Sequence, residues 1–170
     1  MGGIDVKKIL LLLVAAALLL PLTACGTQAS PRDFYSMAVD SPHVPVGTAW
    51  LGMTTDEMYP AVGSITNNQE VRTHLVNGVI ASMTAITSYC HPVGLTWDMS
   101  KDDIAAYYKK DPAVTVDTTS DPHMLTATKT IDGTLYYARI VFYSDGTVEQ
   151  MNLTTDPSLD ALKAPTQSGT

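Results

Sequence analysis

The stretch TLYYARIVFYSDGTVEQMNLT, residues 134–154, decides the fold class of this 170-residue chain. Successive side chains of a strand point to opposite faces of a sheet, and Thr134–Tyr143 places apolar or aromatic side chains on both faces. A strand that is apolar on both faces is typical of a central position. Ser144-Asp145-Gly146 has the composition of a turn and leads into Thr147–Thr154. The stretch therefore predicts a central strand and an antiparallel neighbour joined by a tight turn.

Strands before this stretch are marked by two turn sequences. Asp132-Gly133 precedes it directly, and Asn77-Gly78 lies between two alternating, β-branched runs. Asn-Gly in that setting is the strongest short-range hairpin signal, because both residues tolerate positive φ. The predicted strands are Glu70–Val76, Val79–Tyr89, Ala113–Thr118 and Met124–Ile131.

A near-repeat predicts two helices. Residues 47–58 (GTAWLGMTTDEM) and 94–104 (GLTWDMSKDDI) share Gly, Trp, Met, a hydroxyl residue, an acid and a large apolar residue in the same order. In both copies the hydroxyl residue precedes an acid by three positions, which is the spacing of a helix capping box. The pairs are Thr54 with Glu57 and Ser100 with Asp103. The first helix should be short, because Pro60 cannot donate a backbone hydrogen bond within it, and the second is predicted from Lys101 to about Lys110.

These elements predict an α+β fold, with an antiparallel sheet and short helices on one face. Residues 47–155 are expected to form one domain of two tandem units, 47–91 as helix and hairpin and 94–155 as helix and meander. Edge-to-edge pairing of the two units would form one larger sheet, and the sequence leaves open whether they share one. Residues 25–46 contain three prolines among small and polar residues and are predicted to be a flexible tether, and residues 156–170 a disordered tail.

The N-terminus has the order of a secretory signal peptide. Lys7-Lys8 precedes an unbroken apolar run at Ile9–Leu20, which is too short to span a bilayer core of about 20 apolar residues. The run leads to Leu22-Thr23-Ala24-Cys25, which is similar to the lipobox of bacterial lipoproteins. The resemblance implies that residues 1–24 are a lipoprotein signal peptide, that Cys25 is acylated, and that the protein is anchored in the cell envelope. Because Gly26 is not the Asp that retains such lipoproteins at the inner membrane, the resemblance also implies the outer membrane, facing the periplasm, in a host that has one.

Charge and cysteine content restrict the partners. The formal net charge is −7, and removal of Lys7, Lys8 and Asp5 with the signal peptide changes it to −8. No stretch concentrates Lys or Arg, which argues against a nucleic-acid partner and against a basic membrane-binding face. With Cys25 acylated, Cys90 is the last thiol, so an intramolecular disulfide is excluded. Free cysteines are among the most buried residues, and Cys90 is predicted to be buried.

No catalytic residue, metal site or cofactor site is predicted. A thiol nucleophile needs a base within hydrogen-bond reach, but Cys90 and His91 are adjacent on a predicted strand and point to opposite faces. None of the histidines has a ligand spacing such as i, i+4 on a helix; they are His43, His74, His91 and His123. The acidic pairs Asp56-Glu57 and Asp102-Asp103 lie in first helical turns, where the helix dipole explains them.

The aromatic residues admit two interpretations. Buried aromatic side chains pack between helix and sheet, whereas exposed Trp and Tyr are the usual anchors of protein interfaces. Trp50 and Trp97 are left open between these roles, with core packing favoured. Adjacent helical residues cannot both face the core, so Tyr107 and Tyr108 are predicted to form an exposed binding patch.

A family resemblance appears at the first capping box. GMTTDEM at residues 52–58, followed by Ala61-Val62-Gly63, resembles the opening motif of small outer-membrane assembly lipoproteins of the BamE (SmpA/OmlA) type, which have relatives in the β-lactamase-inhibitor-protein-like fold. Residues 99–104 repeat the pattern, and residues 141–148 resemble the late hairpin of such domains. The match covers about a third of the mature chain. It implies a BamE/BLIP-like fold and a role in binding other proteins.

Three functions follow as hypotheses. The first is a non-enzymatic, lipid-anchored envelope protein that binds a protein partner as an assembly or scaffold module. The second is a lipoprotein that binds a small ligand in a pocket between helices and sheet. The third is an envelope enzyme or redox protein that uses Cys90.

Overall fold

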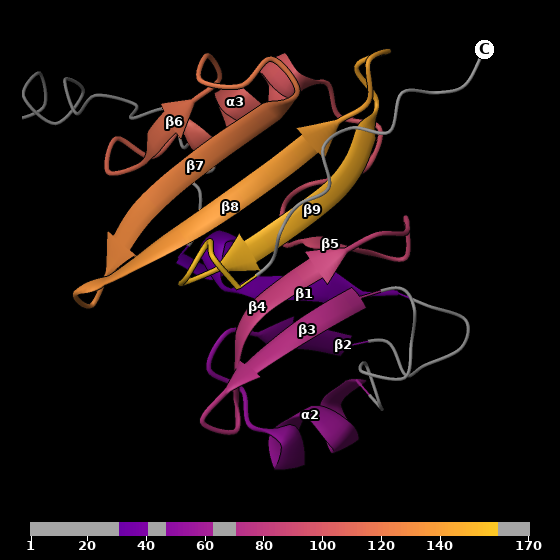
Figure 1. The fold of residues 1–170 in the computed structure, drawn as a ribbon, viewed down its shortest axis with the longest axis vertical. Coiled ribbons are helices and arrows are strands. Elements are labelled where there is room, and N and C mark those ends of the chain that lie inside the picture. The colour runs from indigo at the N-terminus through magenta and orange to yellow at the C-terminus, as the bar shows by residue number, and fades with distance from the viewer. Residues whose placement is uncertain (1–30, 41–46, 63–70, 160–170) are drawn as a thin grey trace, which may run out of the picture.

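The computed structural model describes residues 31–40, 47–62 and 71–159 (Figure 1). The predicted signal peptide, Cys25 and residues 160–170 lie outside the described residues. The fold is a mixed α+β arrangement dominated by two antiparallel sheets, with a few short helices. The prediction of an α+β fold with antiparallel strands is confirmed, and the second, smaller sheet was not predicted.

The larger sheet has six strands in the order β3-β4-β9-β8-β7-β6. Their bounds are β3 Val71–Val76, β4 Val79–Ala85, β6 Thr115–Asp117, β7 Met124–Ile131, β8 Thr134–Phe142 and β9 Val148–Thr154. All neighbours are antiparallel. As predicted, β8 is central: it pairs with β7 on one side and with β9 on the other. The two predicted units meet where β4 pairs with β9.

The hairpin turns form where the sequence predicts them. Asn77 and Gly78 have φ of 53° and 79°, and Asp132 and Gly133 have φ of 50° and 80°. Positive φ at both central positions matches the right-handed twist of the flanking strands. Local turn chemistry thus sets the pairing of β3 with β4 and of β7 with β8.

The smaller sheet has the order β2-β1-β5, with β1 at Ser36–Val39, β2 at Gly47–Trp50 and β5 at Cys90–Pro92. It corrects the predicted tether over residues 25–46. A 3₁₀ helix, η1, spans Pro31–Phe34, and β1 is the middle strand of this sheet. Phe34 of η1 is buried in the core, and so are Met37 and Val39 of β1, because β1 lies between β2 and the much later strand β5. Residues 25–30 and 41–46 lie outside the described residues.

The helices start as predicted. In α3, Lys101–Tyr108, the Ser100 and Asp103 side chains each cap the other's backbone N–H. Ahead of α2, Thr55–Val62, Glu57 N–H donates to Thr54 Oγ1 at 3.3 Å and Thr54 N–H donates to Glu57 Oε2 at 2.8 Å. Both capping boxes are therefore confirmed. α2 lies against β2 and α3 against β7, so the helices do not share one sheet face.

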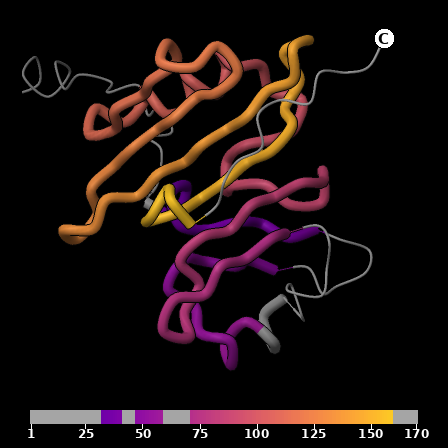
Figure 2. The backbone as a smooth tube through the Cα atoms, viewed as in Figure 1, coloured from indigo at the N-terminus to yellow at the C-terminus, as the bar shows by residue number. Residues whose placement is uncertain are grey.

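One hydrophobic cluster joins both sheets and α3. In the views of Figures 1 and 2 the N-terminal strands lie behind the β3–β4 hairpin, and α3 lies behind β7. Met37 of β1, Met83 of β4 and Met151 of β9 are all fully buried there. The segment after β9 folds back onto the sheet: Pro157 O accepts a hydrogen bond from Arg139 Nη1 at 3.1 Å. The predicted tail of residues 156–170 is therefore ordered at its start.

Candidate functional site

Tyr107 and Tyr108 do not form an exposed patch, which corrects the predicted binding site. Tyr108 is fully buried, and its ring centroid lies 5.1 Å from that of Phe34. Tyr107 is half-buried, and its hydroxyl donates to Asp33 Oδ2 at 2.7 Å. The sequence argument assumed that residues 25–46 are a tether, which leaves one side of α3 exposed to solvent. In the structure η1 covers that side.

The environment of these tyrosines holds both phenols in the protonated form. Burial, together with the carboxyl of Asp33, raises the pKa of Tyr107 well above its ordinary value. Burial likewise raises the pKa of Tyr108, with a smaller contribution from Asp33. Asp33 is itself 2% exposed, so this cluster joins η1 to α3 inside the protein. Asp33 and Tyr108 therefore have a structural role here.

Gly94 completes the contact between η1 and α3. Its φ is +91°, and a Cβ at this position would overlap the Tyr107 hydroxyl and lie 2.6 Å from Tyr107 Cζ. Only glycine leaves room for the Tyr107 ring here while adopting this φ freely.

Cys90 is fully buried, as predicted. It lies in β5, and its carbonyl accepts a hydrogen bond from Trp97 Nε1 at 2.7 Å. The next side chain is turned elsewhere: His91 Nδ1 lies 3.0 Å from Pro92 O. Trp97 therefore has a core role, which settles the choice that the sequence left open for it.

The described residues contain no group of three or more His, Cys, Asp or Glu side chains arranged to hold a metal ion. His43 lies outside them. In this same part of the chain, the helices are all too short or too polar to cross a membrane.

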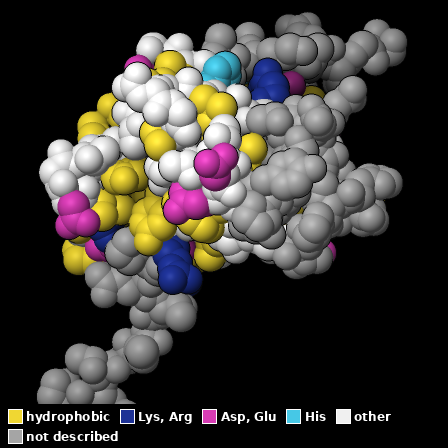
Figure 3. All heavy atoms as spheres, turned by 90° about the horizontal axis from the view of Figure 1, so that it is seen from below, with side chains coloured by type: hydrophobic (Ala, Val, Ile, Leu, Met, Phe, Trp, Pro, Cys, Tyr) yellow, Lys and Arg dark blue, Asp and Glu magenta, His cyan; other side chains and the backbone are white. Residues whose placement is uncertain are grey.

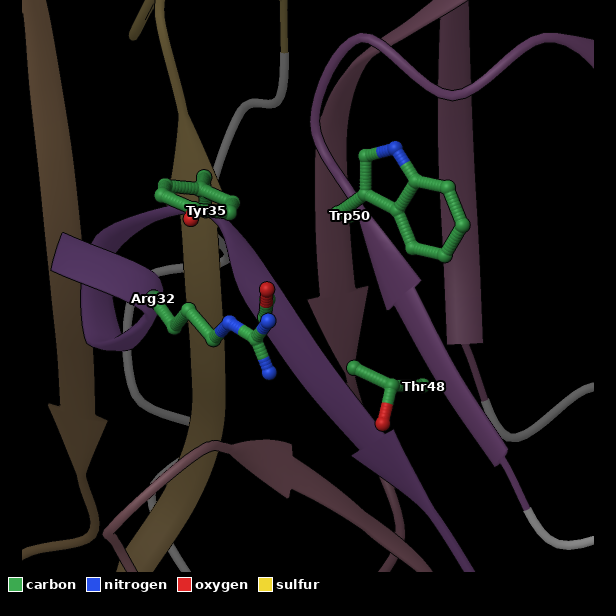
Figure 4. A pocket seen from close by; sticks show the side chains of 5 residues that line it. Arg32, Tyr35, Thr48 and Trp50 are labelled. Carbon is green, nitrogen blue, oxygen red and sulfur yellow. The ribbon is translucent and has the colours of Figure 1, made fainter. Parts of the chain in front are cut away.

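The structure shows a pocket that the sequence did not predict (Figure 4). It has a volume of about 320 Å³ and lies beside η1 and the first two strands of the smaller sheet. Among the described residues, its lining consists of Arg32, Tyr35, Ser36, Thr48 and Trp50. We call it the Arg32 pocket.

Strand pairing and the turn after η1 position this lining. Ser36 and Trp50 are directly paired in the β1–β2 ladder, which places them on one face. The Leu51 N–H donates to Tyr35 O at 2.7 Å, and the Tyr35 ring packs 6.1 Å from the ring of Tyr136 on β8. The aromatic wall at Tyr35 is therefore fixed by both sheets.

Arg32 gives the pocket its charge. In Figure 4 its side chain extends from η1 between Tyr35 and Thr48, with Trp50 beyond. Among the five lining residues it alone is ionised. The neighbouring acid Asp33 accepts a hydrogen bond from the Tyr107 hydroxyl of α3.

A second cavity of about 240 Å³ is lined by Arg72, Ile86, Tyr143, Glu149 and Gln150. It contains both a cation and an acid, and Arg72 Nη2 donates to Gln150 Oε1 at 3.1 Å. Two of its lining side chains are therefore already hydrogen-bonded to each other. On the face shown in Figure 3, hydrophobic, acidic and basic side chains are interspersed, without a stripe of one charge.

No protein-family model matches the chain, and no curated protein or solved structure matches it. The candidate site therefore stands on its own geometry. Sequence reasoning missed Arg32 and Tyr35 because they lie in the proline-containing stretch interpreted as a tether. For Trp50 the sequence left open whether it packs in the core or binds a partner. Its position at a pocket follows only from its pairing with Ser36.

Proposed function

We propose that this chain is a lipid-anchored protein of the bacterial cell envelope that binds a protein partner without catalysing a reaction. The observation that carries the proposal is the Arg32 pocket, which brings Arg, Tyr and Trp side chains together at an opening on the surface. These three residue types are enriched at the centres of protein interfaces, because each offers a large contact area with a polar group. The BamE-type resemblance of residues 52–63 supports the same function, and with it a BamE/BLIP-like arrangement of the domain.

A binding site for a small molecule is the second candidate. The pocket volume of about 320 Å³ lies at the lower end of the range of ligand sites, roughly 300–1,000 Å³. An enzyme that depends on Cys90 has less support, since its side chain is fully buried and its neighbour His91 is directed to a backbone carbonyl. A reactive cysteine is partly exposed in an electropositive environment.

The anchor is placed by the lipobox resemblance, with acylation at Cys25 and outer-membrane localisation in a host with two membranes. If Cys25 carries the lipid, six residues separate it from Arg32, the first pocket residue. An extended chain spans at most about 3.6 Å per residue, so seven steps reach about 25 Å. The pocket is thus held near the membrane surface, where the partner would also be expected.

Site-specific crosslinking in intact cells tests this function. A photo-reactive amino acid replaces Thr48, which is exposed at the pocket, and the matched control replaces Thr147, which is exposed at the β8–β9 turn, at the end of β8 away from Tyr136. We expect a discrete crosslinked species from position 48 only, lost in Cys25→Ser, which cannot be acylated. Equal products from both positions, or none from position 48, would contradict the proposal.

A further inference from the structure

We propose that Asn77 is a site of spontaneous deamidation in the folded protein, reached by a flip of one peptide group within the β3–β4 turn. Asn77 is the only asparagine of the chain that a glycine follows. Asn77 and Gly78 are both exposed. Among the described residues, apart from its chain neighbours, no atom lies within 4 Å of a Cβ placed on Gly78. The turn is therefore open to water and has room to change its conformation.

The reaction is a cyclisation followed by a hydrolysis. The backbone nitrogen of Gly78 attacks Cγ of the Asn77 side chain, so that an N–Cγ bond forms and the Cγ–Nδ2 bond breaks. The side-chain nitrogen leaves as ammonia, with the proton that the Gly78 amide loses. Water then opens the five-membered succinimide at one of its two carbonyls. The product is an aspartate or, where the chain now continues through the side chain, an isoaspartate.

The observed turn holds the reacting atoms apart. Asn77 and Gly78 have φ of 53° and 79°, which is the signature of a type I′ turn, and Val76 pairs with Val79 across it. In this turn type ψ of the first central residue is about +30°. The ring needs Cβ and the next backbone nitrogen to be eclipsed about the Cα–C bond, which in an L-residue occurs near the type II′ value, ψ of about −120°. The ground state of the turn is therefore unreactive.

The other common hairpin turn brings the same atoms together. The first central residue of a type II′ turn has φ of about +60° and ψ of about −120°. Because φ of Asn77 is already 53°, only the peptide group between Asn77 and Gly78 has to rotate. Gly78 then moves to negative φ, which glycine adopts as readily as positive φ. Types I′ and II′ both close two-residue hairpins, so β3 and β4 stay paired while the succinimide forms.

Asn152 provides a contrast within the same molecule. Its side chain is fully buried, and its Nδ2 donates to Ser82 Oγ at 3.0 Å and to Thr84 Oγ1 at 2.9 Å. Asn152 lies in β9, which pairs with β4 on one side and with β8 on the other, so the peptide group after it is not free to flip. Deamidation is therefore expected at Asn77 and not at Asn152.

The two products have different effects on the hairpin. Asp132-Gly133 forms a turn of the same geometry, with φ of 50° and 80°, so an aspartate at position 77 preserves the pairing. An isoaspartate adds one methylene to the backbone, and a two-residue turn then no longer aligns Val76 with Val79. Val79 also bridges to Thr54, so the isoaspartate should loosen the start of α2 as well.

Incubation of the full chain in detergent micelles at mildly alkaline pH, followed by peptide mass spectrometry, tests the inference. We expect aspartate and isoaspartate to accumulate at position 77, with Asn152 unchanged. The rate should stay constant as urea is added below the unfolding transition, because a peptide flip exposes little new surface. A reaction that required global unfolding would instead accelerate about thirtyfold per molar urea, for an m-value typical of small proteins.

Two variants complete the test. Asp132→Asn places a second Asn-Gly in a turn with the same φ values and should deamidate at a similar rate. Asn77→Asp should keep the urea midpoint of the unmodified protein, whereas the separated isoaspartate form should unfold at a lower midpoint.

Four results would each overturn the inference. They are no product at position 77 in a time that fully modifies the urea-unfolded chain, an equal rate at Asn152, an acceleration of about thirtyfold per molar urea, and a negligible rate at position 132 in Asp132→Asn.

Discussion

The substitution Gly94→Ala should destabilise the protein more than its size suggests, because two costs coincide at this residue. The first is backbone strain. Gly94 has φ of +91°, and an L-residue in the left-handed region costs about 1–2 kcal/mol. Alanine regains about 0.4–1 kcal/mol by restricting the unfolded chain. The net strain is therefore about 1 kcal/mol.

The second cost comes from the Tyr107 ring. A Cβ on residue 94 would lie 2.6 Å from Tyr107 Cζ and overlap the hydroxyl, so the ring must move. The hydroxyl then leaves Asp33 Oδ2, to which it donates at 2.7 Å. Losing a hydrogen bond to a buried carboxyl costs about 2 kcal/mol, which brings the expected loss to about 3 kcal/mol.

Urea unfolding followed by circular dichroism measures this loss. With an m-value of about 2 kcal/mol/M, Gly94→Ala should lower the midpoint by about 1.5 M. The matched control is Gly133→Ala, where φ is +80° but no atom lies within 4 Å of the new Cβ. It carries the strain alone and should lower the midpoint by about 0.5 M. In a Tyr107→Ala background, Gly94→Ala should cost no more than the control. Equal midpoints for the two single glycine variants would refute the steric argument.

Three further predictions concern the buried side chains. In the native full chain the Cys90 peptide should remain unmodified by iodoacetamide and react only after unfolding, as followed by mass spectrometry, because its side chain is fully buried. Tyr108→Phe should raise the urea midpoint or leave it unchanged, since the buried Tyr108 hydroxyl finds no hydrogen-bond partner in the described part of the chain and an unmatched buried polar group is costly. A lowered midpoint would show that the hydroxyl is satisfied. Tyr107 and Tyr108 have raised pKa values in the folded protein, so the unfolded state loses its phenolic protons at a lower pH than the folded state. The contribution of these two groups to the free energy of unfolding is therefore fully present below pH about 10 and is lost as the pH rises above it. Urea midpoints at pH 9 and 11 measure the fall, which should be smaller in Tyr107→Phe.

The larger sheet was predictable because its signals are local. Asn77-Gly78 tolerates the positive φ that a two-residue hairpin turn requires at both positions, and the structure has 53° and 79° there. The two-sided apolar pattern of β8 identifies a central strand, since no other position buries both faces. The capping boxes are local in the same sense: Ser100 and Asp103 satisfy each other's backbone amides within one turn.

The smaller sheet and the Arg32 pocket were not predictable, because their signals are distant in the sequence. β1 has four residues, too few for periodicity to identify. Its burial depends on pairing with β2 and with β5, about 50 residues later in the chain. Proline content then favoured a tether. The error extended to Tyr107, whose partner Asp33 belongs to the same misassigned segment.

The segment that contains η1 and β1 connects the Arg32 pocket to α3. The Gly94 substitution should therefore have an effect at the pocket. Arg32 and Asp33 are neighbours on η1, but Arg32 lines the pocket and Asp33 holds Tyr107. η1 also contacts β1, β7 and β8, so loss of the Asp33 contact loosens η1 without releasing it, and the Arg32 side chain is positioned less closely. Gly94→Ala should therefore lower the yield of the crosslinked species from position 48, relative to the amount of folded protein, although Gly94 is not among the described lining residues, and Gly133→Ala should not. An unchanged crosslinking yield in Gly94→Ala would show that the smaller sheet positions Arg32 without help from α3.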